Sequence, residues 1–154
     1  HGFCIGGGFE LALAADIRIS GESGRFGIPA KAIGLFLSHD LVQFIVDAGG
    51  RAVASEIMLE GRIMPADEAA SKNLVTRVVP DAELEEEVMK AARRIADGAP
   101  LSHRFHRKAL TRLADPRPLS KVELDSEHDY ADSEDYMTGY NAFKNREKPK
   151  FQGR

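Results

Sequence analysis

The spacing of apolar and polar positions changes along the chain, and it predicts short strands alternating with helices in the first half. Residues 17–20 alternate and residues 75–79 are mostly β-branched, which is typical of strands, and residues 25–29 form another short strand-like run. Apolar residues recur with the period of a helix in four stretches, and glycine, proline or serine marks their ends. This pattern predicts helices over residues 6–15, 38–48, 51–60 and 65–71. This alternation places the first half in the α/β class.

Helical patterns dominate after Pro80. Asp81 is a candidate cap for a helix that ends at Gly98 and whose apolar face carries Leu84, Val88, Ala91 and Ile95. Three more helices are predicted, over residues 101–113, 120–131 and 133–147. Residues 80–154 carry 14 basic and 15 acidic residues, against 7 and 9 in residues 1–79. We therefore divide the chain into an α/β part, residues 1–80, and a helical part, residues 81–154.

The composition is that of an ordinary globular protein. With 154 residues, of which 43% are hydrophobic, the chain is long enough for one sizeable core. A net charge of -3 gives no basic excess, which argues against duplex nucleic acid and anionic membranes as partners. Cys4 is the single cysteine, so a disulfide framework is excluded and a reducing compartment, cytoplasm or mitochondrial matrix, is expected. Because the chain starts with His1 rather than Met, we expect a fragment.

Three consecutive glycines, Gly6, Gly7 and Gly8, stand where the first helix begins. Glycine lets the backbone approach a ligand closely, and the first helical N–H groups lack partners within the helix, so this turn suits an anion or a developing oxyanion. Neither Gly-Lys-Ser/Thr nor G-x-G-x-x-G spacing follows, so phosphate binding is not indicated.

Glu10 is the one acid in an otherwise apolar helix, which predicts that this helix is buried on nearly all sides. Its carboxylate should then face a cavity or a partner. The structural alternative is an acid in the first turn of a helix, where the dipole favours it by about 0.3–1 kcal/mol.

The segment from Gly6 to Ile19 resembles the signature of the crotonase (enoyl-CoA hydratase/isomerase) superfamily. Further stretches match in order and spacing: RFGIP at 25–29, IMLEG at 57–61, NLVTRVVP at 73–80 and the ending at 141–151. The resemblance therefore covers almost the whole chain.

The resemblance implies a crotonase-type spiral of ββα units, without its amino-terminal part, followed by helices that form trimers. It also implies an active site for an acyl-CoA thioester, with coenzyme A entering as part of the substrate and no separate cofactor. Gly7 carries over as one oxyanion-hole N–H donor, between the substrate-binding Gly6 and Gly8. Glu10 carries over as the general acid or base beside the acyl Cα–Cβ bond. The implied partners are an acyl-CoA thioester and further copies of the chain, as a homotrimer or as a hexamer formed by two trimers.

Ala30 departs from the pattern of the hydratases, which place a second glutamate directly after the proline of the Phe-Gly-x-Pro stretch. Hydration needs one group to activate water and another to handle the proton at Cα, and one of these carboxylates is missing. A methylmalonyl-CoA decarboxylase-like activity is therefore an alternative, because loss of CO2 generates the carbanion without a base at that position. An acyl-CoA hydrolase on the same scaffold is another alternative.

Three further residues are candidates for the site. His39 or Asp40 could replace the missing carboxylate, although Asp40 also suits the first turn of a helix capped by Ser38. Arg146 stands where a basic residue of the family reaches the CoA phosphates, and its structural alternative is a solubilising tail. The two histidines of the helix over residues 101–113 lack a nearby acidic ligand, so no metal site is predicted.

The leading functional hypothesis is an acyl-CoA enzyme of the hydratase/isomerase type, a lyase or isomerase. A different class, motivated by Ala30, is a non-catalytic CoA-binding or RNA-binding homologue. The near-balanced charge makes RNA binding the weaker of these two.

Overall fold

The computed structural model describes all 154 residues, which form two compact units, His1–Met89 and Lys90–Arg154. The helix α4 (Leu84–Ala96) runs through the boundary between them. The change of composition at Pro80 lies before this boundary. No helix is both long and apolar enough to cross a bilayer.

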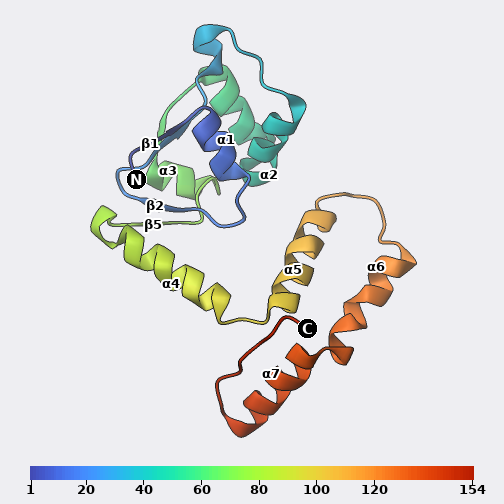
Figure 1. Cartoon of the computed structure of the whole chain (residues 1–154). Helices are drawn as coiled ribbons and strands as arrows, with labels where there is room; N and C mark the ends of the chain where they lie inside the picture. Colours follow the sequence, from blue (N-terminus) through green and yellow to red (C-terminus); the bar gives the residue numbers. More distant parts are fainter. The chain divides into compact units, whose positions relative to one another are not determined.

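The first unit contains two small sheets and the helices beside them (Figure 1). Strand β1 pairs in parallel with β3, β3 pairs antiparallel with β4, and β2 pairs in parallel with β5. Helix α1 contacts both β1 and α2. The elements that precede α4 are β1 (Phe3–Ile5), α1 (Gly7–Leu13), β2 (Ile19–Gly21), β3 (Arg25–Gly27), a 3-10 turn (Ala30–Ile33), α2 (His39–Ser55), a π-turn (Glu56–Glu60), β4 (Met64–Pro65), α3 (Ala66–Ser71), β5 (Arg77–Val79) and a second 3-10 turn (Asp81–Glu83).

Three of the predicted signals for helix ends and breaks, at Ser38, Gly50 and Gly61, are confirmed. The Ser38 hydroxyl accepts a hydrogen bond from the Leu41 N–H at 3.4 Å, as a helix cap does. Gly50 has φ 78° and ψ 169°, which kinks α2 at the predicted break. Gly61 ends the following π-turn in the left-handed conformation, with φ 66°. The positive φ at Gly50 and Gly61 explains why glycine occupies both positions.

The core of the first unit fixes α1 against the sheet. Six side chains are almost fully buried, and they come from α1, α2, the π-turn, β4 and two connecting segments: Phe9, Ile28, Ile45, Ile57, Met64 and Leu74. The rings of Phe9 on α1 and Phe26 on β3 lie 5.4 Å apart in a tilted arrangement. Burial of each such side chain contributes about 1.5–3 kcal/mol, so the position of α1 is strongly determined.

The prediction that α1 is buried on nearly all sides is wrong. Phe9 and Leu13 are buried, whereas Leu11 is 77% exposed and Ala14 and Ala15 are exposed. Within this chain α1 packs mainly against β1 and α2, and the face that carries Leu11 stays exposed. A mostly apolar sequence therefore does not establish burial on every side of this helix.

Four charged side chains form a closed ion-pair network on the first unit. Arg62 contacts Glu56 and, at 3.0 Å, Glu68. Lys72 contacts the same two carboxylates, and its distance to Glu68 is 2.9 Å. The hydrogen bond from Lys72 is the largest cause of the lowered pKa of Glu56 and also of Glu68. The network ties the π-turn to α3.

Asp81 does not cap α4, which corrects the sequence prediction. It lies in a 3-10 turn before α4, and its carboxylate accepts a hydrogen bond from the Ser23 N–H at 3.2 Å. Hydrogen bonds from Ser23 lower the pKa of Asp81. Gly21 leaves the room for this contact, because a Cβ there would lie 1.9 Å from an oxygen of Asp81.

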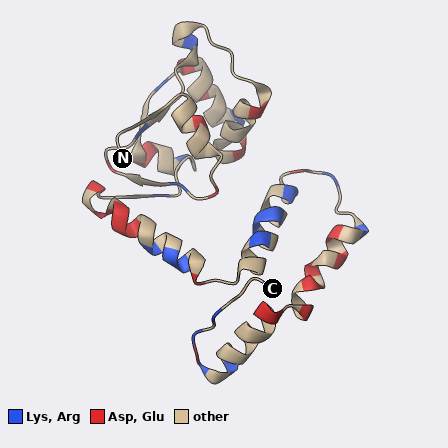
Figure 2. Ribbon diagram, viewed as in Figure 1, with Lys and Arg blue, Asp and Glu red and all other residues tan.

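The second unit is helical and consists of the end of α4, α5 (Pro100–Leu113), α6 (Lys121–Asp125), a 3-10 segment (Ser126–Asp132) and α7 (Glu134–Asn145). Figure 2 shows that the charged residues of α5 are basic, whereas those of α6 and the 3-10 segment are mostly acidic. The single helix predicted over residues 120–131 is interrupted. The Ser126 hydroxyl donates to the Glu123 carbonyl at 2.7 Å, a local bond of the kind that competes with helix geometry.

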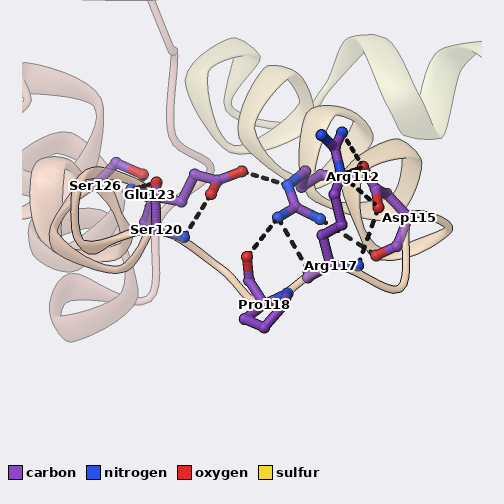
Figure 3. Close-up of polar contacts among 7 residues, drawn as sticks. All are labelled: Arg112, Asp115, Arg117, Pro118, Ser120, Glu123 and Ser126. Carbon is purple, nitrogen blue, oxygen red and sulfur yellow. Dashed lines mark hydrogen bonds and ion pairs between the residues drawn. The ribbon is translucent and has the colours of Figure 1, made fainter.

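Two buried or half-buried acids hold the second unit together. Glu123 accepts a hydrogen bond from the Ser120 N–H at 2.7 Å and pairs with Arg112, which joins α6 to α5 (Figure 3). Asp135 is almost fully buried and accepts hydrogen bonds from the N–H groups of Gln152, at 2.8 Å, and Gly153, at 3.1 Å. The carboxylate of Asp135 thereby anchors the end of the chain to α7.

Candidate active site

A cavity of about 480 Å³ lies beside the glycine turn of the first unit. Three segments line it: the junction of β1 and α1, the 3-10 turn after β3, and the segment that leads into α2. The lining residues are Ile5, Gly6, Gly7, Glu10, Ile28, Pro29, Ala30, Ala32, Ile33, Leu35, Phe36, Leu37, Ser38 and Leu41. The cavity thus brings together Gly6, Gly7, Glu10 and Ala30 from the positions that the sequence predicts.

The backbone of Gly6 shapes the turn. Gly6 has φ 57° and ψ -130°, its N–H donates to the Gly27 carbonyl at 2.9 Å, and its carbonyl accepts from the Phe9 and Glu10 N–H groups at 2.9 and 3.0 Å. The N–H groups of Gly7 and Gly8, the first two of α1, have no hydrogen-bond partner in the chain. Since Gly7 also lines the cavity, its N–H is available as a donor to a ligand there.

Glu10 is half-buried in the first turn of α1 and lines the same cavity as Gly7. It is the only titratable side chain in that lining, and Ser38 is the only other polar one. The Ser38 hydroxyl is engaged in capping α2. Any proton transfer by a side chain of this lining therefore falls to Glu10.

Ala30, where the resemblance of the sequence implies a glutamate in the hydratases, is buried and lines the cavity. Its methyl group leaves that part of the wall apolar. His39 and Asp40 are exposed at the start of α2 and lie outside the lining. The structure therefore does not bring a replacement carboxylate from residues 39–40 into this cavity.

Cys4 lies next to the turn, and burial raises the pKa of its thiol. Its sulfur contacts the Gly8 carbonyl at 3.5 Å and packs against the core. A raised pKa keeps the thiol protonated and poorly nucleophilic, in agreement with a packing role.

Arg146 belongs to the second unit, where it is exposed and ends α7 with φ 59°. No group of three or more histidine, cysteine and acidic side chains is arranged to hold a metal ion.

The apolar wall of the cavity was not predicted from the sequence. Ile33, Leu35 and Phe36 line it, and Phe36 is 94% exposed. The signal that could have revealed this wall is the apolar run Ile33-Gly34-Leu35-Phe36-Leu37, which fits no helix or strand period and yet contains four large apolar residues.

A second cavity of the first unit, of about 500 Å³, is lined by residues of β1, α1 and β2 and contains no acidic side chain. Its one arginine, Arg18, donates to the Leu74 carbonyl at 2.8 Å and to the Ala15 carbonyl. Burial is the main cause of the lowered pKa of Arg18. Arg18 thus links the segment that follows α1 to the segment around Leu74. The lining of this cavity contains no carboxylate that could act as an acid or base.

Comparison with known proteins identifies the family to which this chain belongs. The family model described as enoyl-CoA hydratase/isomerase matches residues 1–154. The chain belongs to the enoyl-CoA hydratase/isomerase family. A crystal structure of an enoyl-CoA hydratase/carnithine racemase from Magnetospirillum magneticum is 47% identical and superimposes with a TM-score of 0.97, over 99% of this chain and 57% of that one. The α/β fold is therefore of the crotonase type.

Two curated members of the family are similar over nearly the whole chain. A probable mitochondrial enoyl-CoA hydratase 2 of Arabidopsis thaliana is 31% identical over 99% of this chain and 52% of its own length. An (E)-benzylidenesuccinyl-CoA hydratase of Thauera aromatica is 33% identical over 99% of this chain and 60% of its own length. The chain thus spans between half and two thirds of the length of these relatives.

Proposed function

We propose that the protein processes acyl-CoA thioesters by enolate chemistry of the hydratase/isomerase type. The observation that carries the proposal is the joint presence of the free Gly7 N–H and the Glu10 carboxyl group in one cavity. Membership of the enoyl-CoA hydratase/isomerase family and the hydratase names of its relatives support the acyl-CoA part of the proposal.

In this proposal the Gly7 N–H donates a hydrogen bond to the thioester oxygen. When a proton leaves or joins Cα, negative charge moves onto that oxygen, and the fixed N–H dipole stabilises the charge. Loss of one such donor costs on the order of 10²–10³ in rate in other enzymes. Gly6 contributes by its small size, since it lines the cavity and no side chain there obstructs the thioester, whereas Gly8 lies outside the lining.

Glu10 acts as the general acid or base on the reacting carbons. Its position in the first turn of α1, on the cavity wall, places the carboxyl group three residues from the donor. Because the buried Phe9 fixes this helix in place, the Gly7 N–H and the Glu10 carboxyl group keep a fixed position relative to each other.

Ala30 favours a second candidate on the same scaffold. With Glu10 as the only acid in the lining, a reaction that needs no second carboxylate, such as decarboxylation of a methylmalonyl-CoA-like thioester or thioester hydrolysis, also suits the cavity. Here the same donor would stabilise the enolate formed when the carbon–carbon bond to CO2 breaks.

Assembly into trimers or hexamers is part of the proposal. It is supported by large apolar side chains that lie exposed on the second unit, including Leu110, Val122 and Phe143. Arg146, exposed at the end of α7, is the proposed contact for the phosphates of CoA. The protein is expected to act in the cytoplasm or mitochondrial matrix, and a CoA-binding or RNA-binding homologue without activity is the non-catalytic alternative.

The test compares turnover of crotonyl-CoA and methylmalonyl-CoA by the intact protein and by Glu10→Gln. The amide keeps the size of the side chain but cannot exchange a proton, so we expect kcat on the preferred substrate to fall by about 10²–10⁴-fold with little change in acyl-CoA affinity. Glu60→Gln is the matched control, because Glu60 is exposed and outside the cavity. Absence of turnover of either substrate, with CoA affinity intact, would instead support the non-catalytic homologue.

A further inference from the structure

Gly27, the last residue of β3, fixes the start of the glycine turn. Its carbonyl accepts a hydrogen bond from the Gly6 N–H at 2.9 Å, which extends the parallel pairing of β1 and β3 by one residue. Gly6 directly precedes Gly7, whose N–H is the proposed donor to the thioester oxygen. The direction of that donor therefore depends on the position of Gly27.

The main chain at Arg62 packs directly against Gly27. A Cβ at Gly27 would lie 2.4 Å from the Arg62 carbonyl oxygen and 2.8 Å from the Cδ1 atom of Ile63. Gly27 is buried, so it has no room to move toward this segment. The position of the Arg62 main chain therefore limits the position of Gly27.

Residues 61–63, which we call the brace segment, also support another part of the cavity wall. A Cβ at Gly61 would lie 2.9 Å from the Cε atom of Lys31, which follows Ala30 in the 3-10 turn. Ala30 lines the cavity, and this 3-10 turn contacts the π-turn that ends at Gly61. The brace segment thus lies behind both the glycine turn and the position of the missing carboxylate.

Side-chain charges hold the centre of the brace segment. Arg62 is exposed, and its guanidinium group contacts Glu56 on the π-turn and, at 3.0 Å, Glu68 on α3. Lys72 contacts the same two carboxylates, so each acid is paired with two cations. A single exposed ion pair contributes little to the free energy of unfolding, whereas a network that joins two elements through one residue restricts the movement of that residue.

We propose that Arg62 is a positioning residue for the Gly7 N–H, acting through its own main chain, Gly27 and Gly6. The inference rests on the proposed function and adds to it a residue that lies outside the cavity. In enzymes a displacement of about 1 Å at the reacting groups can reduce the rate about 100-fold. A small shift of the glycine turn is therefore enough to weaken donation to the thioester oxygen.

The test compares Arg62→Met with Arg77→Met in the intact protein. Methionine keeps much of the length of arginine and removes its charge. Arg77 is the matched control, because its side chain is 38% exposed, against 43% for Arg62, and pairs with Glu87 at 2.8 Å in the same unit, outside the cavity lining. Arg62→Met should lower kcat about tenfold and leave KM within about twofold, whereas Arg77→Met should change neither.

Amide hydrogen exchange, followed by NMR, measures the same displacement without a substrate. The Gly6 N–H should exchange about tenfold faster in Arg62→Met, because its hydrogen bond to the Gly27 carbonyl opens more often. The Thr76 N–H, which donates to the Arg18 carbonyl at 2.8 Å beside the pairing of β2 and β5, should keep its exchange rate. An unchanged rate there separates a local effect on the turn from a general loss of stability.

Arg62→Lys keeps a cation beside Glu56 and Glu68, both of which a lysine, Lys72, already contacts, so this variant should recover most of the loss in kcat and in Gly6 protection. Equal effects of methionine and lysine at position 62 would overturn the role of the charge network.

Unchanged exchange of the Gly6 N–H in Arg62→Met, or faster exchange with an unchanged kcat, would overturn the positioning role and leave the acyl-CoA function standing. A wild type that turns over no acyl-CoA would overturn the proposed function instead. The exchange rate of Gly6 would then still decide whether Arg62 holds the glycine turn.

Discussion

Gly7 and Glu10, three residues apart in the first turn of α1, line one cavity, with a free backbone N–H at the first and a carboxyl group at the second. Both positions follow from the turn at Gly6 and from the packing of Phe9 between them. One rigid helix end thus carries the two groups that the proposed reaction uses.

Substitution of Gly6 tests the turn itself. Gly6→Ala meets no steric contact but keeps a backbone with φ 57°, which is strained for a residue with a Cβ. We expect a loss of about 1–3 kcal/mol in the free energy of unfolding, measured by urea denaturation. Gly8→Ala is the comparison for stability, because Gly8 has equal space and no positive φ, and alanine favours the helix. Equal destabilisation by the two variants would refute the strained turn.

A glutamate at position 30 tests the missing carboxylate. Ala30→Glu adds a second acid to the cavity that holds Glu10, and we expect the kcat for hydration of crotonyl-CoA to rise at least about tenfold, because two groups then share the proton transfers. Ala30 is buried, so the larger side chain should also lower stability by about 1–3 kcal/mol. A folded variant with unchanged hydration would favour decarboxylation or hydrolysis as the native reaction.

The pH dependence of stability tests the junction between α5 and α6. Glu123 accepts hydrogen bonds from the Ser120 N–H and from Arg112, and these lower its pKa from 4.5 to about 2 (Figure 3). A carboxyl group whose pKa is depressed by folding stabilises the folded state above its unfolded pKa. That stabilisation is lost as the pH falls from about 4.5 to about 2.

The corresponding measurement is the thermal unfolding midpoint of the wild type and Glu123→Gln between pH 6 and pH 2. We expect the wild type to be more stable at pH 6 and the difference to shrink through this window, because protonation removes the same charge that the variant lacks. Glu127→Gln, at an exposed position of the neighbouring 3-10 segment, is the control. A difference that stays constant down to pH 2 would contradict the depressed pKa.

Local signals in the sequence predicted most of the elements, because caps and breakers act within a few residues. As their residue types indicate, Ser38 caps α2, Gly50 kinks it and Gly61 ends the π-turn. The strands β1 and β4 were not predicted, since three and two residues are too few for a period to be recognised.

Features that depend on distant contacts could not be predicted from the sequence. Leu11 is exposed because the elements that pack against α1 cover only one side of it. Asp81 bonds to Ser23, far away in sequence, rather than capping the helix that follows it. For the site, the glycine turn and Glu10 could be identified from their spacing, but the wall around Phe36 depends on how the irregular segment after Ala30 bends.

The proposed role of the Gly7 N–H is tested most directly by removing that one hydrogen atom. Gly7 is the first residue of α1, a position that tolerates proline, and a side chain there meets no atom within 4 Å. Gly7→Pro lacks the N–H, whereas Gly7→Ala keeps it and adds a comparable obstruction near the backbone.

The deciding quantity is the ratio of kcat/KM for the preferred acyl-CoA between Gly7→Ala and Gly7→Pro, with circular dichroism confirming that both variants are folded. A donor to the developing oxyanion predicts that the alanine variant is about 10²–10³-fold more active than the proline variant. Equal activity of the two folded variants would contradict the role of this N–H in catalysis.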